Sequence, residues 1–241
     1  MVDKVNIAIA TMTKNQGSRL EEWVRYHFSI GFSKFIIFLD SCTDTSYETL
    51  KALEGVDIDV YNTSEIEDGE HLKLTWIKRS HKMYDYTIKS YSHLDWIGFI
   101  EVDEFIFLQN NNLDFLSLLS EQQADCVYIN SWDFKPPFDE SKQILGQSNL
   151  VWTDRQRANS IYTWRGKSII RPSMFKKCVD AHHFFHKDYG ISKEFKMGRN
   201  EESFTQQYHG KEVYIDDSLL RIYHFRNHSP SNMNEYRSLE Y

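Results

Sequence analysis

The first 110 residues of the chain alternate between short apolar segments and segments with helical periodicity. Apolar, β-branched segments predict buried strands at residues 5–11, 34–40, 56–62 and 96–100. Apolar residues recur at helical spacing between them, in residues 18–31, 44–55 and 71–92. Strands that alternate with helices form right-handed crossovers, so the sequence predicts an α/β fold with a mostly parallel central sheet that is flanked by helices.

Local signals mark the ends of the first two predicted helices. Ser18 and Glu21 stand three residues apart, as in a capping box, and predict that the first helix begins at Ser18. Gly31 and Gly55 follow the last apolar positions of the two helices. They predict the helix ends, because glycine readily adopts the left-handed conformation that closes many helices.

The rest of the chain has a weaker period. A helix is predicted at residues 113–122 and a single strand at 126–134. Residues 135–190 mix Pro, Gln, Asn and aromatic residues, and we expect loops and short strands around an acceptor pocket there. In residues 212–236 we expect a further strand, a connection and a helix after Pro230. We expect one domain over residues 1–241, because no internal repeat or low-complexity tract divides the chain.

Charge and composition exclude several classes of protein. The formal net charge is -7, and binding to duplex nucleic acid depends on Lys and Arg, so no nucleic-acid partner is expected. No apolar segment reaches the about 20 residues that span a bilayer, and the apolar part of the N-terminus is too short for a secretory signal. Cys42, Cys126 and Cys178 are widely spaced and predict neither disulfides nor a metal site. We expect a cytoplasmic location.

The predicted strand at residues 96–100 is followed by three carboxylates within four positions, those of Glu101, Asp103 and Glu104. Ligands of open parallel sheets bind beyond the carboxyl ends of the strands, and Asp40 ends another predicted strand at that edge. In an extended segment, Glu101 and Asp103 point the same way while Val102 faces the core. Two such carboxylates could share Mg²⁺ or Mn²⁺, which would neutralise a diphosphate leaving group. Alternatively, the acids only end a strand that faces water.

Five motifs in order resemble one known group of enzymes. The first is TMTKNQGSRLEEWVRYHFSIGFSKFIIFLDSCTDTS, the second is DWIGFIEVDEF, and the third is GKSIIRP. The histidine pair at 182–183 and the segment RIYHFRNHSPSNMNEY follow. In this order they resemble the GT-A, family-2-like glycosyltransferases, especially the group related to glycosyltransferase family 92.

The resemblance implies a GT-A fold in which residues 1–110 bind a nucleotide sugar and residues 111–241 bind the acceptor. In the enzymes that this chain resembles, the acid-x-acid element, here Glu101-Val102-Asp103, is the DxD motif. It would hold a metal ion and the donor diphosphate. Asp103 would be the principal metal ligand, and Glu101 a second ligand or a contact to the ribose. His224 would complete the metal or diphosphate site, and imidazole suits Mn²⁺ better than Mg²⁺.

The resemblance also implies a donor pocket next to the metal. Asp40 would contact the base or the ribose of the nucleotide. Thr11, Lys14 and Asn15, in the first β-to-α turn, would border the same pocket. Three features depart from the pattern of the group: Glu101 replaces the usual aspartate, the segment DSCTDTS lacks glycine, and Asn227-His228-Ser229 replaces a Lys-Ser pair.

Lys167 and Arg171 stand four residues apart in the motif GKSIIRP. If this segment is a strand, both side chains face one side. They could bind the donor phosphate or the acidic cluster, and they could equally be surface charges.

His182, His183 and His186 form a histidine-rich segment without the HExxH signature of metalloproteases. We expect them to pack among aromatic residues near the substrate pocket. A metal role, or a hydrogen bond to donor phosphate or acceptor sugar, is the alternative.

An inverting glycosyl transfer needs a general base near the acceptor hydroxyl. The candidates are the carboxylates of Asp133, Asp188, Glu201 and Glu202. The segment GRNEES resembles a turn into a helix, whose N-terminus would favour an ionised Glu201 or Glu202. Each of these acids also has an ordinary explanation as a helix-capping or first-turn residue.

The sequence therefore predicts a nucleotide-sugar-dependent, inverting glycosyltransferase that needs Mn²⁺ or Mg²⁺. The expected acceptor is a saccharide or a glycolipid, and the resemblance suggests a role in polysaccharide biosynthesis with peripheral association at the inner membrane face. Two other classes stay open: a non-catalytic carbohydrate- or nucleotide-binding protein on the same scaffold, and a nucleotidyltransferase.

Overall fold

The structure is a computed structural model. It describes residues 5–66, 74–109, 114–135, 145, 151–152, 166–179, 182–188, 207–208, 212–214 and 219–225. For residues 133–135, 151–152, 207–208 and 212–214 it describes the backbone alone. The predicted helix after Pro230 and much of residues 135–190 lie outside the described residues.

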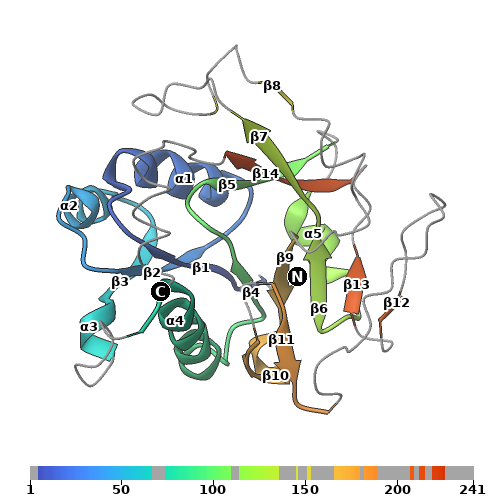
Figure 1. Cartoon of the computed structure of the whole chain (residues 1–241). Helices are drawn as coiled ribbons and strands as arrows, with labels where there is room; N and C mark the ends of the chain where they lie inside the picture. The colour runs from blue at the N-terminus through green and yellow to red at the C-terminus, as the bar shows by residue number, and fades with distance from the viewer. Residues whose placement is uncertain are drawn as a thin grey trace.

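An eight-stranded central sheet has the strand order β12-β13-β6-β9-β4-β1-β2-β3 (Figure 1). Its strands are β1 (Ile7–Thr13), β2 (Lys34–Leu39), β3 (Asp57–Asn62), β4 (Trp96–Phe99), β6 (Cys126–Ile129), β9 (Lys167–Ile170), β12 (Gln207–Tyr208) and β13 (Glu212–Tyr214). β4, β1, β2 and β3 run parallel, whereas β9 lies antiparallel between β4 and β6. The carboxyl end of β4 therefore meets the amino end of β9.

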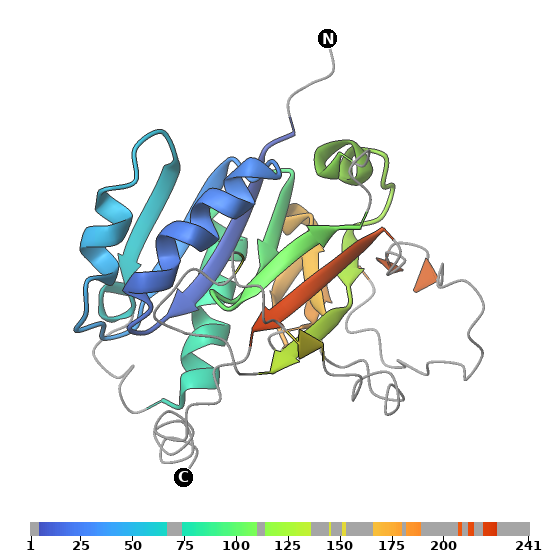
Figure 2. The same cartoon turned by 90° about the horizontal axis from the view of Figure 1, so that it is seen from above.

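A second sheet lies over one face of the central sheet, beside the first helix (Figure 2). Its order is β5-β14-β7-β8, with β5 (Glu104–Leu108), β14 (Leu220–Phe225), β7 (Ser131–Lys135) and β8 (Val151–Trp152). A hairpin of β10 (Phe175–Cys178) and β11 (Phe184–His186) packs on the opposite face.

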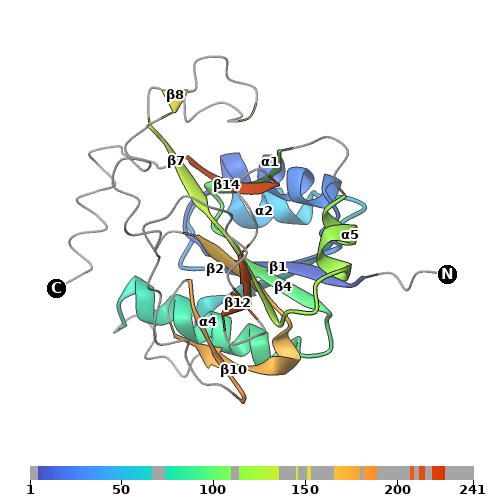
Figure 3. The same ribbon diagram turned by 90° about the vertical axis from the view of Figure 1, so that its right-hand side faces the viewer.

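The helices cover both faces of the central sheet. α1 (Gly17–Ser29), α2 (Ser46–Lys51) and α5 (Phe115–Ser120) lie on the face of the second sheet, and α4 (Trp76–Ser90) lies on the other (Figure 3). A short α3 (Thr63–Ile66) follows β3, and a 3-10 turn spans Pro172–Met174. The expected α/β class, with a multi-strand sheet flanked by helices, is confirmed.

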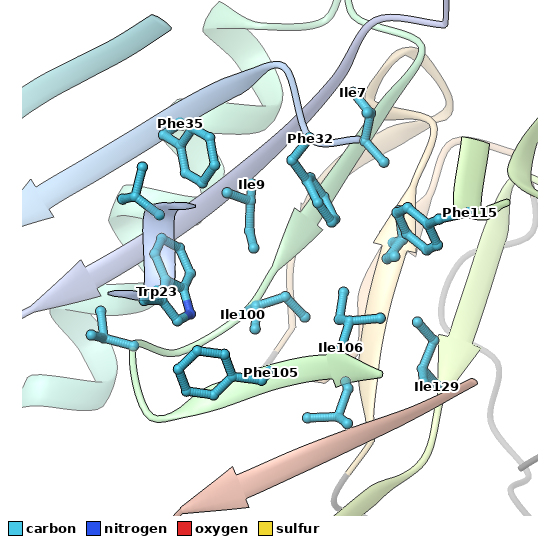
Figure 4. Close-up of a cluster of buried hydrophobic side chains, with 14 of the residues drawn as sticks. Ile7, Ile9, Trp23, Phe32, Phe35, Ile100, Phe105, Ile106, Phe115 and Ile129 are labelled. Carbon is cyan, nitrogen blue, oxygen red and sulfur yellow. The ribbon is translucent and has the colours of Figure 1, made fainter. Parts of the chain in front are cut away.

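The alternation along β1 divides the core into two layers. Ile7 and Ile9 face α1 and the second sheet, whereas Ala8 and Ala10 face α4. In the first layer, Trp23 of α1 packs among the residues that Figure 4 labels. Its Nε1 donates a hydrogen bond to the carbonyl oxygen of Glu104 at 3.0 Å, so core packing also fixes the start of β5.

The expected capping box at Ser18 is wrong. α1 begins at Gly17, and no side chain caps it at Gln16. Instead, the carboxylate of Asp44 accepts a hydrogen bond from the N–H of Gly17 at 2.8 Å. A loop that follows β2 therefore supplies the cap. The expected helix end is confirmed, because α1 ends at Ser29 and Gly31 has a φ of +116°.

The single strand predicted at residues 126–134 is also wrong, because the chain changes sheets there. β6 belongs to the central sheet and β7 to the second sheet. Asn130 separates them, and its carbonyl oxygen accepts a hydrogen bond from the N–H of Ile222 at 2.9 Å.

The central sheet contains strands from both predicted halves of the chain, since β9 lies between β4 and β6. The single domain over residues 1–241 stays a prediction. Within the described ranges, no helix combines the length and the apolar character that a membrane-spanning segment needs.

Candidate active site

The acidic residues lie in a turn that leads from the central sheet to the second sheet. β4 ends at Phe99, and β5 begins at Glu104. The N–H of Glu104 donates a hydrogen bond to the carbonyl oxygen of Glu101 at 2.9 Å, which closes the turn. The expected extended geometry of the acid-x-acid element is therefore wrong. The expected burial of Val102 is correct, with 4% of its surface exposed.

Lys167 lies between two of these carboxylates. Because β9 runs antiparallel to β4, its first residue reaches the carboxyl end of β4. The Lys167 Nζ is 3.0 Å from Oε2 of Glu101 and 3.4 Å from Oε2 of Glu104. The lysine side chain is 1% exposed. A buried cation thus links the acidic turn to β9.

His224 approaches the turn from the second sheet. β14 pairs with β5 so that His224 lies beside Glu104 in register. The Nε2 of His224 is 3.2 Å from Oδ2 of Asp103, and its Nδ1 is 3.9 Å from Oε1 of Glu104. The N–H of Phe225 also donates to the carbonyl oxygen of Asp103 at 2.8 Å. The structure thus brings together the three residues that the resemblance implied for the metal site.

The buried charges shift the pKa values of two of these groups in the direction that keeps them ionised. The ammonium of Lys167 lowers the pKa of Glu101, although burial opposes this effect. Burial also disfavours the ammonium itself, but Glu101 and Glu104 raise the pKa of Lys167 above its ordinary value. The pair is therefore charged.

The pKa values of Asp103 and Glu104 shift in opposite directions. Burial disfavours the ionised form of Asp103, but the adjacent His224 and the positive charge of Arg19 hold the pKa of Asp103 below its ordinary value. Burial raises the pKa of Glu104 to about 7, against the opposing effect of Lys167. Asp103 is thus the ionised carboxylate next to the imidazole.

Sequence reasoning gave no role to Arg19 or Glu104. Arg19 lies on the buried face of α1 and is 4% exposed. A charged residue one helical turn before the buried Trp23 is the signal that could have identified it, because such a residue is rarely buried without a partner. For Glu104 the signal was its place directly before the apolar segment FIFL.

Asp40 follows β2 and is 1% exposed. Its carboxylate accepts hydrogen bonds from Nε and Nη2 of Arg79 at 2.9 and 2.7 Å, and from Oγ1 of Thr63 at 2.9 Å. Both carboxylate oxygens are therefore bound by groups of the protein.

The other residues of the predicted donor pocket lie at the end of β1 and in the turn after it. Thr11 belongs to β1 and not, as expected, to the turn. Thr11 is buried, and its hydroxyl has no hydrogen-bond partner among the described residues. Lys14 is half-buried and Asn15 is exposed. Asn15 has a φ of 52°, and its Oδ1 accepts a hydrogen bond from the N–H of Thr43 at 2.8 Å. This bond joins the turns that follow β1 and β2.

Arg171 lies at the other end of β9 from Lys167. Its guanidinium donates to the carbonyl oxygens of Gln122 and Ala124 at 3.0 and 3.1 Å. The guanidinium carbon lies 4.1 Å from the ring centroid of Trp96, the first residue of β4. The structure therefore does not bring Arg171 to the acidic turn.

Of the predicted general bases, Asp188 is exposed after β11, and its N–H donates to Nδ1 of His186. The Nε2 of His186 is 3.2 Å from Asp125, which precedes β6 at the end of the sheet opposite the acidic turn. Asp188 is thus remote from the turn. Asp133 lies in β7, and its backbone pairs in register with His224. Glu201 and Glu202 lie outside the described residues.

His183 and His186 pack against aromatic residues, as expected, but His186 lies with Asp125 away from the acidic turn. The Nδ1 of His182 is 2.7 Å from the carbonyl oxygen of Gly166, and the ring of His183 stacks on Tyr128. Among the described residues, the group that could hold a metal ion consists of Glu101, Glu104 and His224.

Two solved structures align with 76% and 71% of this chain. Glucosyl-3-phosphoglycerate synthase from Mycobacterium tuberculosis, in complex with Mn²⁺, uridine-diphosphate-glucose and phosphoglyceric acid, has a TM-score of 0.40 and 13% sequence identity, covering 71% of this chain and 58% of that one. HddC from Yersinia pseudotuberculosis has a TM-score of 0.40 and 11% identity, covering 76% and 87%.

Curated relatives share more of the sequence. A glycosyltransferase family 92 protein of Arabidopsis thaliana is 26% identical over 190 residues, which is 75% of this chain and 32% of the relative. One from Oryza sativa is 24% identical over 197 residues, 77% of this chain and 30% of the relative. The chain thus spans about a third of the length of these relatives. The sequence model of glycosyltransferase family 92 matches residues 3–238. The resemblance noted in the sequence is confirmed: this chain belongs to glycosyltransferase family 92.

Proposed function

We propose that the protein is a metal-dependent glycosyltransferase that uses a nucleotide-sugar donor. Family membership supports the activity, and one contact carries the metal dependence. Asp103 and His224 are distant in sequence, yet their Oδ2 and Nε2 atoms lie 3.2 Å apart at the carboxyl end of β4. Ligands of open α/β sheets bind at that edge.

The donor atoms at this edge fit a divalent ion. Carboxylate oxygens suit Mg²⁺ and Mn²⁺, and a neutral imidazole favours Mn²⁺. The side chains of Asp103 and Glu101 are 27% and 41% exposed, so a substrate can reach them. Asp103 and His224 would hold the ion, with Glu101 within reach. When bound, the ion would neutralise the charge that develops on the diphosphate leaving group.

The chain's own residues prepare the site. Lys167 keeps Glu101 ionised, and His224 together with the buried Arg19 keeps Asp103 ionised. Thr11, Lys14, Asn15 and Asp40 would line the donor pocket. Arg79 donates hydrogen bonds to both oxygens of Asp40. This carboxylate would therefore help to shape the nucleotide pocket more than it would accept hydrogen bonds from the nucleotide.

The acceptor would approach from the second sheet. An inverting displacement requires a base at the acceptor hydroxyl, and Asp133 lies on the strand beside His224. Glu201 and Glu202 remain the other candidates. A saccharide or glycolipid acceptor, a cytoplasmic location and peripheral association with the inner membrane face remain part of this proposal.

A turnover assay tests the proposal. The protein is incubated with uridine- and guanosine-diphosphate sugars, with Mn²⁺, with Mg²⁺ or with a chelator, and release of the nucleoside diphosphate is measured. We expect metal-dependent release that falls by about 100-fold or more in Asp103→Asn, because the ionised ligand is lost. The matched control is Asp57→Asn, which neutralises an exposed carboxylate at the start of β3.

Three outcomes would contradict the proposal. Donor binding without any turnover would indicate a binding protein. Release of pyrophosphate from nucleoside triphosphates would indicate nucleotidyl transfer. Turnover that survives in Asp103→Asn would remove the acidic turn from the mechanism.

A further inference from the structure

We propose that Lys167 is a permanent cation of the active site, which reserves Glu101 and Glu104 for itself and leaves the divalent ion to Asp103 and His224. The inference rests on the proposed function, because it concerns how that ion is held. It assigns Glu101, the first acid of the DxD-like element, to the lysine and not to the metal.

The distances support this division. Glu101, Glu104 and His224 each offer a ligand atom, and these atoms lie within 4.8 Å of one another, so the three residues alone would form a metal site. However, the ammonium of Lys167 lies 3.0 Å from Glu101 and 3.4 Å from Glu104. A metal ion bound by both glutamates would lie against this ammonium, and two cations repel at that distance.

The structure holds Lys167 in its position beside Glu101 and Glu104. It begins β9, which is paired on both sides, with β4 and with β6. Its neighbour Gly166 donates a hydrogen bond from its N–H to the hydroxyl of Tyr128 at 2.7 Å. The lysine side chain is 1% exposed, so water cannot replace the two carboxylates if they turn to another cation.

Glu104 is held as firmly from the other side. Its carboxylate accepts a hydrogen bond from the N–H of Glu101 at 3.0 Å, and its side chain is 2% exposed. Removing the ammonium would therefore leave two carboxylates and an imidazole already arranged around one point. A divalent ion is the occupant that such a set favours.

Direct measurement of Mn²⁺ binding tests the inference without any turnover. Calorimetric titration of the metal-free protein gives Kd for Mn²⁺ in the wild type and in size-matched variants. Asp103→Asn should weaken binding by about 10- to 100-fold. Glu101→Gln should change Kd by only about threefold, because it removes a nearby charge but no ligand.

The lysine itself is tested by Lys167→Met. We expect Mn²⁺ to bind about tenfold more tightly or better, because Glu101 and Glu104 become ligands and add to the charge of the site. The matched control is Arg171→Met, which removes a cation from the same face at the other end of β9 and should leave Kd unchanged.

The results separate the two proposals. A wild type that does not bind Mn²⁺ would overturn both. If the wild type binds Mn²⁺ but Glu101→Gln weakens binding as much as Asp103→Asn, only the inference is overturned, because Glu101 is then a ligand. This pair decides the question even if Lys167→Met fails to fold. If Lys167→Met folds and binds Mn²⁺ no more tightly than the wild type, the inference is likewise overturned.

Discussion

Among the glycines that the structure describes, Gly166 has the least room for a side chain. A Cβ atom at this position would overlap the ring of Tyr128 and the carbonyl oxygen of Ile129. Both backbone groups of Gly166 are also in use, since its carbonyl oxygen is 2.7 Å from Nδ1 of His182. A carbonyl only accepts, so Nδ1 of His182 carries the proton and the tautomer of the ring is fixed. Gly166 therefore sets the positions of both Lys167 and His182.

Gly166→Ala should lower the free energy of unfolding by about 2–4 kcal/mol, because neither the ring nor the strand backbone can move aside cheaply. Denaturant unfolding measures the change. The control is Gly55→Ala, where a Cβ meets nothing within 4 Å and only the φ of +76° is unfavourable, which costs about 1 kcal/mol. A Gly166→Ala variant as stable as the control would show that the site is not tightly packed.

Sequence spacing predicts which face a residue occupies better than which end of a sheet it reaches. Lys167 and Arg171 were expected to face one side, yet only Lys167 meets the acids. The difference arises because β9 is inserted antiparallel between β4 and β6, which no local pattern indicates. Asp188 was separated from the acidic turn for a similar reason, since it follows a hairpin on the opposite face.

Among the elements, α1 is fastened to β5 by a buried histidine. The Nδ1 of His27 donates to the carbonyl oxygen of Trp23 at 2.9 Å, and its Nε2 accepts from the N–H of Ile106 at 3.4 Å. This arrangement requires the neutral ring. Burial lowers the pKa of His27 from 6.5 to about 3.

Acid should therefore weaken the attachment of α1. Between pH 6.5 and about 3 the unfolded state binds a proton at His27 that the folded state does not, so the free energy of unfolding falls as the pH falls. The expected slope is about 1.4 kcal/mol per pH unit for this one group. Denaturant unfolding of His27→Phe should show a lower stability at pH 7 and lack this part of the slope.

The pH dependence of the wild type must be compared with that of His27→Phe, because the titration of Glu104 changes the free energy of unfolding in the opposite direction. Its pKa is raised from 4.5 to about 7, so its contribution to stability is lost as the pH rises through that range. The control is His93→Phe, a change at an exposed histidine. A His27→Phe variant with the slope of the wild type would contradict the assignment.

Elements with a strong period were predictable, and their ends were predictable only where the signal is local. Strands β1 to β4 and helices α1, α2 and α4 follow the apolar pattern, whereas α3 and β5 were not predicted. Gly31 ends α1 as expected. The start of α1 was missed because Asp44, distant in sequence, provides the cap in place of Ser18. The turn at residues 101–104 was read as extended because its closing hydrogen bonds come from backbone and Glu104 groups that no periodicity records.

In the molecule as a whole, β14 lies where the two sheets meet. Two of the crossings from the central sheet to the second sheet lie at the acidic turn and at Asn130. The backbone of β14 is hydrogen-bonded to both crossings, through Ile222 to Asn130 and through Phe225 to Asp103. It also pairs with β5 and β7 on its two sides. The late strand thus holds the two sheets together.

Hydrogen exchange tests this role. We expect the amides of Ile222 and Phe225 to exchange as slowly as those of β1, because they open only when the sheets separate. The amides of β3, the edge strand of the central sheet, should exchange faster. Rapid exchange in β14 with slow exchange in β1 would show that the second sheet opens independently.

The order in which synthesis releases the chain adds a consequence. Both crossings and all three acids emerge from the ribosome long before residue 225, so a nascent polypeptide carries an acidic loop with no imidazole beside it. If the metal ion binds as proposed, an incomplete chain cannot turn over nucleotide sugar. The site becomes complete only when β14 has paired with β5 and β7.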